Sequence, residues 1–342
     1  MIEGYRIHPG EHCGSASMRS LLEYYCGLEL PEPAVFGLGA GLGAMYITGD
    51  FMDPPRAMFG RTGSLEVDLG RHLGIDYREE SVDDDDEAWR IAREEVLAGR
   101  PTMLSGDILY LDYREYKVHF PAHRFVMLGF DDDIQKAFIA DRIRDVPEAC
   151  SYGALRTSRN PPEGMSTFNL WGKFHDAEVG RSLPEATALA LDTCARAMLG
   201  RNTDEPGVFG QTAGVTHGVA AIRAFADDLP SWADDPKAAW LASFNARAIE
   251  KFGNGGGQFR RLYAAFLEWA RNLDPALVPE AAPGLAWRAA DGWTAISSEL
   301  AKVGEEGAPD GVWSEAARIA SSVADIEEEL FERISDRNAS TQ

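Results

Sequence analysis

A change of composition after residue 182 constrains the fold of this chain more than any other feature. From Leu183 onwards the sequence is rich in alanine, and apolar residues recur with the 3.6-residue period of amphipathic helices. Helices are expected there at 184–199, 214–228, 237–252, 258–271, 285–302 and 312–335. The preceding half carries strand patterns as well as helix patterns, and 342 residues exceed one ordinary core. We therefore expect an α+β chain, with a mixed domain over residues 1–180 followed by an all-helical domain over residues 181–342.

The net charge limits the partners of the chain. It contains 55 Asp and Glu against 33 Lys and Arg, a formal net charge of −22. Nucleic acids and anionic membranes require a basic surface, so we expect neither as a partner. No long apolar run predicts a membrane span or a secretory signal. The four cysteines lack the spacing of a disulfide scaffold or a zinc site, which favours a reducing cytoplasm and no metal.

Cys13 lies where a polar loop rich in Gly, Pro and His turns into a predicted helix. Ser15 and Ser17 are candidate N-caps of this helix, and its apolar stripe consists of Met18, Leu21, Leu22 and Tyr25. Free N–H groups and the positive end of the helix dipole favour a thiolate, the form that a nucleophilic cysteine needs. From the local sequence alone, a small apolar residue packed beneath a loop explains Cys13 equally well.

A predicted β-hairpin follows more than a hundred residues later. An apolar strand over 125–130 and a returning strand over 137–140 flank a polar turn. In a hairpin centred on Asp132, His123 and Asp141 are directly opposite each other, with Cβ atoms about 4.5–5.5 Å apart. An acid that orients a histidine base would be placed in this way.

The glycine-rich stretch 37–43 contains Gly39, Gly41 and Gly43. Its spacing nominally fits a dinucleotide-binding fingerprint, but that fingerprint needs a strand before it, and the preceding residues carry prolines and no clean strand. We expect no cofactor. A backbone that comes close to the cysteine or to its substrate is the better use of such glycines.

Cys13, His123 and Asp141 are, in that chain order, the parts of a Cys–His–acid nucleophile system. This layout resembles papain-like cysteine enzymes, and Cys13-Gly14-Ser15 resembles their local cysteine signature. His119 ranks second as the histidine, since it meets Asp141 only if the turn is centred near residue 130.

The chain departs from the papain-like pattern at one position. Papain-like enzymes usually carry a glutamine shortly before the cysteine, which helps to bind the oxyanion, whereas this chain has Ile7 there. The backbone N–H of Cys13 can supply one donor. Candidates for the second donor, or for substrate binding, are His8, His12, His119, Gly39, Gly41 and Gly43.

A narrower resemblance covers most of the chain. It rests on HCGSASMRSLLEYYCG (12–27), VFGLGAGLGAMYI (35–47), GRPTMLSGDILYLDY (99–113), HFPAHRFVMLGFDDD (119–133), FIADR (138–142) and FGNGGGQFRRLYAAFLEWA (252–270). These stretches resemble the butirosin biosynthesis protein H family. The resemblance implies a papain-like cysteine-enzyme domain followed by an all-helical domain, and an acyltransferase of natural-product assembly. It places the catalytic roles on Cys13, His123 and Asp141.

We therefore predict an acyltransferase that moves an acyl group from an acyl carrier protein or pantetheine thioester, through acyl-Cys13, to a small amine. An amidase or peptidase would use water in place of the amine, and a cyclase would use a nucleophile within the same acyl chain. The sequence does not separate these three enzymes. A non-catalytic binding module is the alternative from another class.

Carrier proteins are usually acidic, so an acidic enzyme would need a local basic face to bind one. One candidate is the start of the helix that follows the glycine-rich loop 253–257, where Arg260 and Arg261 could bind an anion. The other interpretation of this loop is a flexible corner between helices. A second candidate face consists of Arg142, Arg144, Arg156 and Arg159. Whether the chain forms a homo-oligomer is left open.

Overall fold

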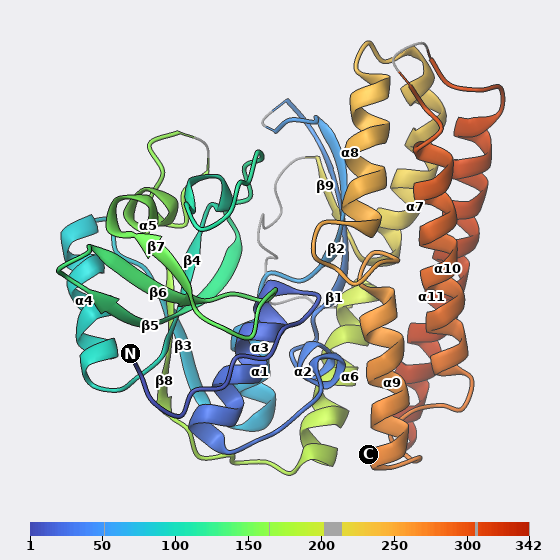
Figure 1. Cartoon of the computed structure of the whole chain (residues 1–342). Helices are drawn as coiled ribbons and strands as arrows, with labels where there is room; N and C mark the ends of the chain where they lie inside the picture. The colour runs from blue at the N-terminus through green and yellow to red at the C-terminus, as the bar shows by residue number, and fades with distance from the viewer. Residues whose placement is uncertain (51, 164, 202–213, 305–306, 342) are drawn as a thin grey trace. The chain divides into compact units, whose positions relative to one another are not determined.

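The computed structural model describes residues 1–50, 52–163, 165–201, 214–304 and 307–341 (Figure 1). These residues form helices and two antiparallel sheets, which confirms the expected α+β class. The chain divides into two compact units. Unit 1 consists of Met1–Val35 and Leu73–Gly180, and unit 2 of Phe36–His72 and Arg181–Gln342. None of the helices in the described ranges has the length and apolar composition needed to cross a membrane.

Unit 1 is built on a six-stranded antiparallel sheet with strand order β3-β8-β4-β5-β6-β7. The strands are β3 (Asp76–Glu80), β4 (Thr102–Gly106), β5 (His123–Asp131), β6 (Lys136–Ala140), β7 (Glu148–Ser151) and β8 (Trp171–Asp176). The helices of this unit are α1 (Cys13–Cys26), α4 (Asp85–Leu97), α5 (Tyr152–Arg159) and the short η1 (Ile108–Tyr110). The chain passes between the units within α2 (Glu32–Leu38) and α3 (Leu65–Leu73).

Strand β5 is covered on both faces, which explains its continuous apolar sequence. Phe125 and Met127 belong to a core cluster shared with α4 and α5. Val126, which points to the opposite face of the sheet, lies beside Ala16 and Ser17 of α1. Figure 1 shows this sheet between α1 and α4. The helix that begins at Cys13 is therefore held against the strand that begins at His123.

Unit 2 combines a three-stranded sheet, of order β2-β1-β9, with a group of helices. Its strands are β1 (Leu42–Thr48), β2 (Arg56–Arg61) and β9 (Val215–His217). Its helices are α6 (Leu183–Met198), α7 (Gly218–Asp228), η2 (Leu229–Asp234), α8 (Ala238–Glu250), α9 (Arg260–Leu273), α10 (Ala282–Leu300) and α11 (Val312–Thr341). Ser182 and Glu185 form a capping box at the start of α6, where the composition changes.

The compact units are divided differently from the predicted domains, since unit 2 also contains Phe36–His72, and one of their boundaries follows Gly180. Phe36–His72 groups with the C-terminal residues because β1 pairs with β9, for example Tyr46 with Thr216. The C-terminal region is therefore not entirely helical. A three-residue strand at the start of a predicted helix has too little sequence pattern to be recognised.

Candidate active site

Cys13 is the first residue of α1, and only 5% of its surface is exposed. The helix is capped by His12 rather than by a serine, since the Nδ1 atom of His12 accepts a hydrogen bond from the N–H of Ser15 at 3.2 Å. At the other end, Gly27 adopts a left-handed conformation that stops the helix. Cys13 thus lies at a fixed helix start, as the sequence predicted.

Two histidines, His12 and His123, lower the pKa of the Cys13 thiol. Burial alone would raise the pKa of this thiol, but His12 and His123 both hydrogen-bond to it and favour the thiolate, so its pKa lies well below the ordinary value. Burial raises the pKa of the other cysteine thiols, to about 11 in Cys26 and about 12 in Cys150 and Cys194. Among the four cysteines, Cys13 is thus the one with a lowered thiol pKa, which is the property that a nucleophilic cysteine needs.

His123 is paired with Asp141, and both side chains are buried. The Nε2 atom of His123 lies 3.1 Å from Oδ1 of Asp141. Burial would lower the pKa of His123, but the carboxylate of Asp141 raises it to about 9. Burial would raise the pKa of Asp141, but His123 holds it well below the usual range. These pKa shifts all favour the charged forms: a Cys13 thiolate, a His123 imidazolium and an Asp141 carboxylate.

Asp141 is held by further donors. The Tyr113 hydroxyl donates to Oδ2 at 3.0 Å, and the backbone N–H of Arg142 donates to Oδ1 at 2.6 Å. Because each carboxylate oxygen accepts a hydrogen bond, the buried charge is compensated. Sequence reasoning missed Tyr113, since no periodic signal links residue 113 to the hairpin.

The hairpin register differs from the predicted one by two residues. Val126 pairs with Ala140, and extending this register places Asp141 opposite Phe125 rather than opposite His123. A shift of two residues leaves both side chains on the same face of the sheet, because side chains alternate with period two. His123 and Asp141 are therefore diagonal neighbours whose side chains still meet.

His119 does not meet Asp141. Its Nδ1 lies 2.7 Å from Oδ2 of Asp107, whose other oxygen accepts from the N–H groups of Leu109 and Phe120. Asp107 is buried and thus anchors the loop between β4 and β5. His119 thus contacts Asp107 in this loop, and its role in substrate binding stays a prediction.

His8 is directed away from the thiol. Its Nε2 contacts the carboxylate of Glu23, and its backbone N–H donates to the hydroxyl of Ser20 at 3.0 Å. Glu23 follows Cys13 by ten residues, about 15 Å along α1 at 1.5 Å per residue, so this contact directs the His8 ring towards the C-terminal half of the helix. A role of His8 in oxyanion or substrate binding stays a prediction.

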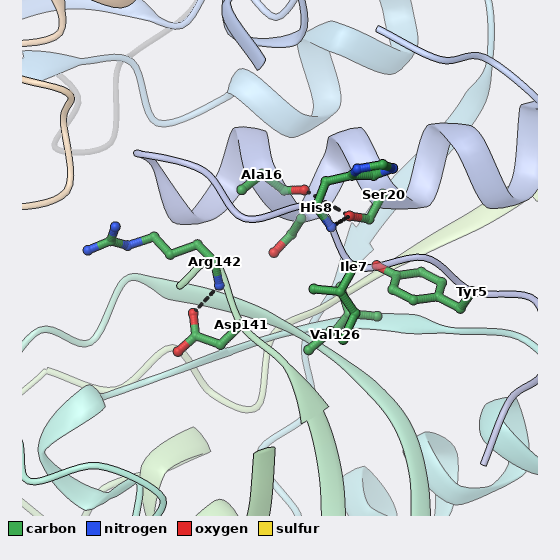
Figure 2. A pocket seen from close by; sticks show the side chains of 10 residues that line it. Tyr5, Ile7, His8, Ala16, Ser20, Val126, Asp141 and Arg142 are labelled. Atoms are coloured by element: carbon green, nitrogen blue, oxygen red, sulfur yellow. Dashed lines mark hydrogen bonds between the residues drawn. The ribbon is translucent and has the colours of Figure 1, made fainter. Parts of the chain in front are cut away.

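A small pocket lies between the N-terminal segment, α1 and the β5–β6 hairpin (Figure 2). Figure 2 shows His8 beside Ser20, while Asp141 and Arg142 lie at another part of the lining. Ile7, which holds the position of the papain-like glutamine, also lines this pocket. The full lining consists of Tyr5, Ile7, His8, Ala16, Ser17, Ser20, Val126, Ala140, Asp141 and Arg142.

The candidate glycines belong to unit 2, where close packing requires them. A Cβ atom at Gly39 would lie 2.6 Å from the carbonyl oxygen of Leu65, and one at Gly41 would lie 2.6 Å from the Leu65 side chain. A Cβ atom at Gly43 would lie 3.0 Å from the backbone of Arg61. These contacts explain the glycines without a substrate, and their role in substrate binding stays a prediction.

Arg260 is not available to an anion. Only 1% of its surface is exposed, and its Nε and Nη2 atoms donate to Glu327, each at 2.8 Å. Its Nη1 donates to the carbonyl of Gly43 at 3.0 Å. Arg261 is half-buried and donates to the hydroxyl of Thr294. The first basic candidate face therefore loses its main cation, because Arg260 is part of the core of unit 2.

The second candidate basic face, which consists of Arg142, Arg144, Arg156 and Arg159, contains both buried and exposed arginines. Arg159 is buried and donates to the carbonyls of Ala88 and Asn169, whereas 62% of the Arg144 side chain is exposed. Arg142 donates from Nη1 to the carbonyl of Gly10 at 3.4 Å. The exposed positive charge nearest Asp141 in the sequence is thus Arg144.

The start of α1 offers free hydrogen-bond donors. The N–H groups of Ser15 and Ala16 donate to His12, but in the described part of the chain nothing accepts from the N–H groups of Cys13 and Gly14. Groups of this kind stabilise an oxyanion that forms beside the sulfur. Across the same described residues, no cluster of His, Cys, Asp and Glu side chains has the composition of a metal site.

Sequence reasoning also missed Glu32, at the start of α2. Its buried carboxylate accepts from the N–H groups of Glu11 and His12, both at 2.8 Å, and from the hydroxyl of Ser15 at 2.9 Å. Two prolines flank Glu32, so the sequence reads as a turn and gives no sign of this contact.

Two family models match the chain. The model of the butirosin biosynthesis protein H N-terminal region matches residues 12–142, which include Cys13, His123 and Asp141. The model of a domain of unknown function (DUF4872) matches residues 156–334, which is more than half of the chain. A comparison with curated proteins gives no match. The chain therefore belongs to the butirosin biosynthesis protein H family, and its C-terminal region belongs to the DUF4872 family.

Proposed function

We propose that this protein is an acyltransferase, which moves an acyl group from a thioester through an acyl-Cys13 intermediate to an amine. Membership in the butirosin biosynthesis protein H family suggests a biosynthetic enzyme with an acyltransferase-like role. The observation that carries the proposal is the buried Cys13 thiol, whose hydrogen-bonded partner His123 is itself held by Asp141. This arrangement supports the proposal that Cys13, His123 and Asp141 act as a catalytic triad of the papain-like kind.

The first half-reaction exchanges one thioester for another. The Cys13 thiolate attacks the carbonyl carbon of the donor, and the carbonyl oxygen becomes an oxyanion that the N–H groups of Cys13 and Gly14 can stabilise. The tetrahedral intermediate collapses, the bond to the donor sulfur breaks, and the leaving thiolate takes the proton of the His123 imidazolium. Acyl-Cys13 and a free donor thiol remain.

The second half-reaction forms an amide. The amine nitrogen attacks the carbonyl carbon of acyl-Cys13 while neutral His123 takes one of its protons. The bond to sulfur then breaks, and the thiolate–imidazolium pair is restored. Asp141 keeps the His123 ring in one tautomer, because its carboxylate contacts Nε2 and leaves Nδ1 for the proton transfers.

The donor is proposed to be an acyl carrier protein or a pantetheine thioester, and the acceptor a small amine. Since the two thioesters of the first step are nearly equal in free energy, acyl-Cys13 accumulates if no amine is supplied and water is excluded. Hydrolysis or cyclisation would start from this same intermediate.

The experiment is to incubate the protein with acyl-pantetheine or acyl-carrier thioesters and to measure the intact mass. One acyl group should be added on Cys13, and an amine should discharge it faster than buffer does. Cys13→Ala should abolish the addition. If the label leaves at the same rate with and without every amine, the enzyme is a hydrolase or a cyclase, and the released product tells which. If no thioester loads Cys13, the binding-module alternative is favoured.

A further inference from the structure

Glu32 is a buried carboxylate whose donors all belong to the segment around Cys13. Only 6% of its surface is exposed, and a buried carboxylate is costly unless its oxygens accept hydrogen bonds. One oxygen accepts from the N–H of Glu11, and the other from the N–H of His12 and the hydroxyl of Ser15. Glu32 therefore fixes the backbone and a side chain on both sides of the nucleophile.

The helix cap favours one tautomer of His12. The backbone N–H of Ser15 can only donate, so a neutral His12 ring that accepts this bond at Nδ1 carries its proton on Nε2. The Ser15 hydroxyl lies 3.1 Å from the same Nδ1 and donates to Glu32. His12 also hydrogen-bonds to the Cys13 thiol, for which Nε2–H is the donor that the cap leaves free.

The same loop is tied to the other half of the triad. Gly10 donates from its N–H to the carbonyl of Arg142 at 2.8 Å, and Arg142 follows Asp141 directly. A Cβ atom at Gly10 would lie 2.6 Å from Oε2 of Glu32, so only glycine fits between the carboxylate and the loop. Glu32 and Arg142 thus hold residues 10–12 from two sides.

We propose that His12 is a second histidine of the active site, which donates its Nε2–H to the Cys13 sulfur at rest and to the oxyanion during acyl transfer. Glu32, acting through Ser15 and the backbone of His12, is its positioning residue. The proposal rests on the proposed function. In this proposal, His12 supplies the side-chain donor to the oxyanion that papain-like enzymes take from a glutamine, and that Ile7 cannot provide.

The first test compares two reactions of the His12→Asn variant. Asparagine is a good N-cap and can still accept from the N–H of Ser15, so α1 keeps its cap while the Nε2–H donor is lost. Acylation by an acyl-pantetheine forms an oxyanion, whereas alkylation by iodoacetamide does not. Single-turnover acylation should fall by about 100-fold or more. Alkylation, measured at a pH where the thiol is fully ionised, should stay close to the wild-type rate.

The second test uses Glu32→Gln, with Glu29→Gln as the matched control. Glu29 lies three residues away in sequence, its side chain is 71% exposed, and it pairs with Arg6 at the surface. In Glu32→Gln, the NH₂ group of the amide would face the N–H and O–H donors that Glu32 now accepts from, so the segment around His12 would shift. The variant should therefore raise the midpoint of the alkylation pH profile and slow acylation. Glu29→Gln should change neither, and thermal unfolding of both variants checks the fold.

The outcomes separate this proposal from the proposed function. If wild-type protein loads acyl groups and both His12→Asn and Glu32→Gln load them at the wild-type rate, the role of His12 is excluded and the acyltransferase stands. If acylation and alkylation of His12→Asn fall by the same factor, His12 is only a helix cap. If wild-type protein never loads an acyl group, the proposed function fails. The alkylation midpoints then decide whether His12 and Glu32 stabilise the thiolate.

Discussion

At the scale of single residues, the four cysteines differ in how readily they ionise. The pKa of Cys13 is lowered by His12 and His123 against the effect of burial, while burial raises those of Cys26, Cys150 and Cys194. Limiting iodoacetamide below neutral pH should therefore alkylate Cys13 first, which peptide mass spectrometry measures.

The control for this prediction is His123→Ala. Removal of the imidazolium should raise the alkylation midpoint of Cys13, since the thiolate loses one of its two stabilising neighbours. Faster reaction of Cys26 in the wild-type protein would contradict the assignment of the nucleophile, because half-buried Cys26 is the most accessible of the other three.

Under the proposed function, the ionisation of His123 should set the pH range of acyl loading. Loading should increase with pH through the lowered pKa of Cys13 and decrease as His123 loses its proton near its pKa of about 9. Asp141→Asn removes the carboxylate that raises the pKa of His123, so the decrease should move to lower pH. The maximal rate should fall by up to about 10⁴-fold. The pH dependence of single-turnover loading measures both effects, and an unchanged upper limit would contradict the role of Asp141.

At the scale of elements, the strands of the His–Asp hairpin could be predicted and its register could not. The continuous apolar run of β5 reflects burial on both faces, which a sequence displays directly. The position of the turn depends on local backbone geometry, including an irregularity between Met127 and Gly129, and the sequence does not display this. The pairing of His123 with Asp141 was predicted because the error was an even number of residues.

The cap of α1 shows a second limit of the sequence. Serine is a common N-cap residue, but the hydroxyl of Ser15 donates to Glu32. The cap is formed by His12 instead, whose Nδ1 accepts the hydrogen bond from the backbone N–H of Ser15. A contact between residues 15 and 32 depends on how α2 packs beside the start of α1. Helix propensity and periodicity contain no information about such a contact.

Helices α9 and α11 are joined by a buried ion pair. Glu327 accepts from Arg260 and from the indole N–H of Trp293 at 2.9 Å, and its surface is fully buried. Glu327→Ala should destabilise unit 2 by about 3–5 kcal/mol, because an uncompensated guanidinium stays buried. Urea unfolding followed by tryptophan fluorescence measures this loss.

The matched control for the ion pair lies on the same helix. Glu329 pairs with Arg333 at the surface, with both side chains about half exposed, so Glu329→Ala should change the stability little. An equal effect of the two variants would contradict the structural role assigned to Arg260.

At the scale of the whole molecule, the net charge of −22 makes any acidic partner depend on local cations. Arg144 is exposed and lies three residues after Asp141, with Glu148 3.3 Å from its Nε. Arg144→Glu should slow loading from an acyl carrier protein by about 10-fold at low salt and leave loading from acyl-pantetheine unchanged.

Arg318→Glu is the control for the carrier prediction. Arg318 is equally exposed but belongs to α11 in unit 2, where it pairs with Glu315. Loading rates from the two donors, measured over a range of salt concentrations, test whether Arg144 contacts the carrier protein. A loss with acyl-pantetheine as well would mean that Arg144 acts on the reaction rather than on the carrier.

The interleaved units have a consequence for synthesis on the ribosome. The β1–β2 hairpin emerges early, but β9, which completes its sheet, follows more than 150 residues later. At a translation rate of about 5–20 residues per second, one edge of β1 stays unpaired for roughly 10 to 30 seconds before β9 is synthesised. During that interval the nascent chain exposes an apolar strand edge, a target for chaperones and a starting point for aggregation. Slow elongation before residue 215 would lengthen this exposure, so codon choice in that stretch should influence the yield of soluble protein.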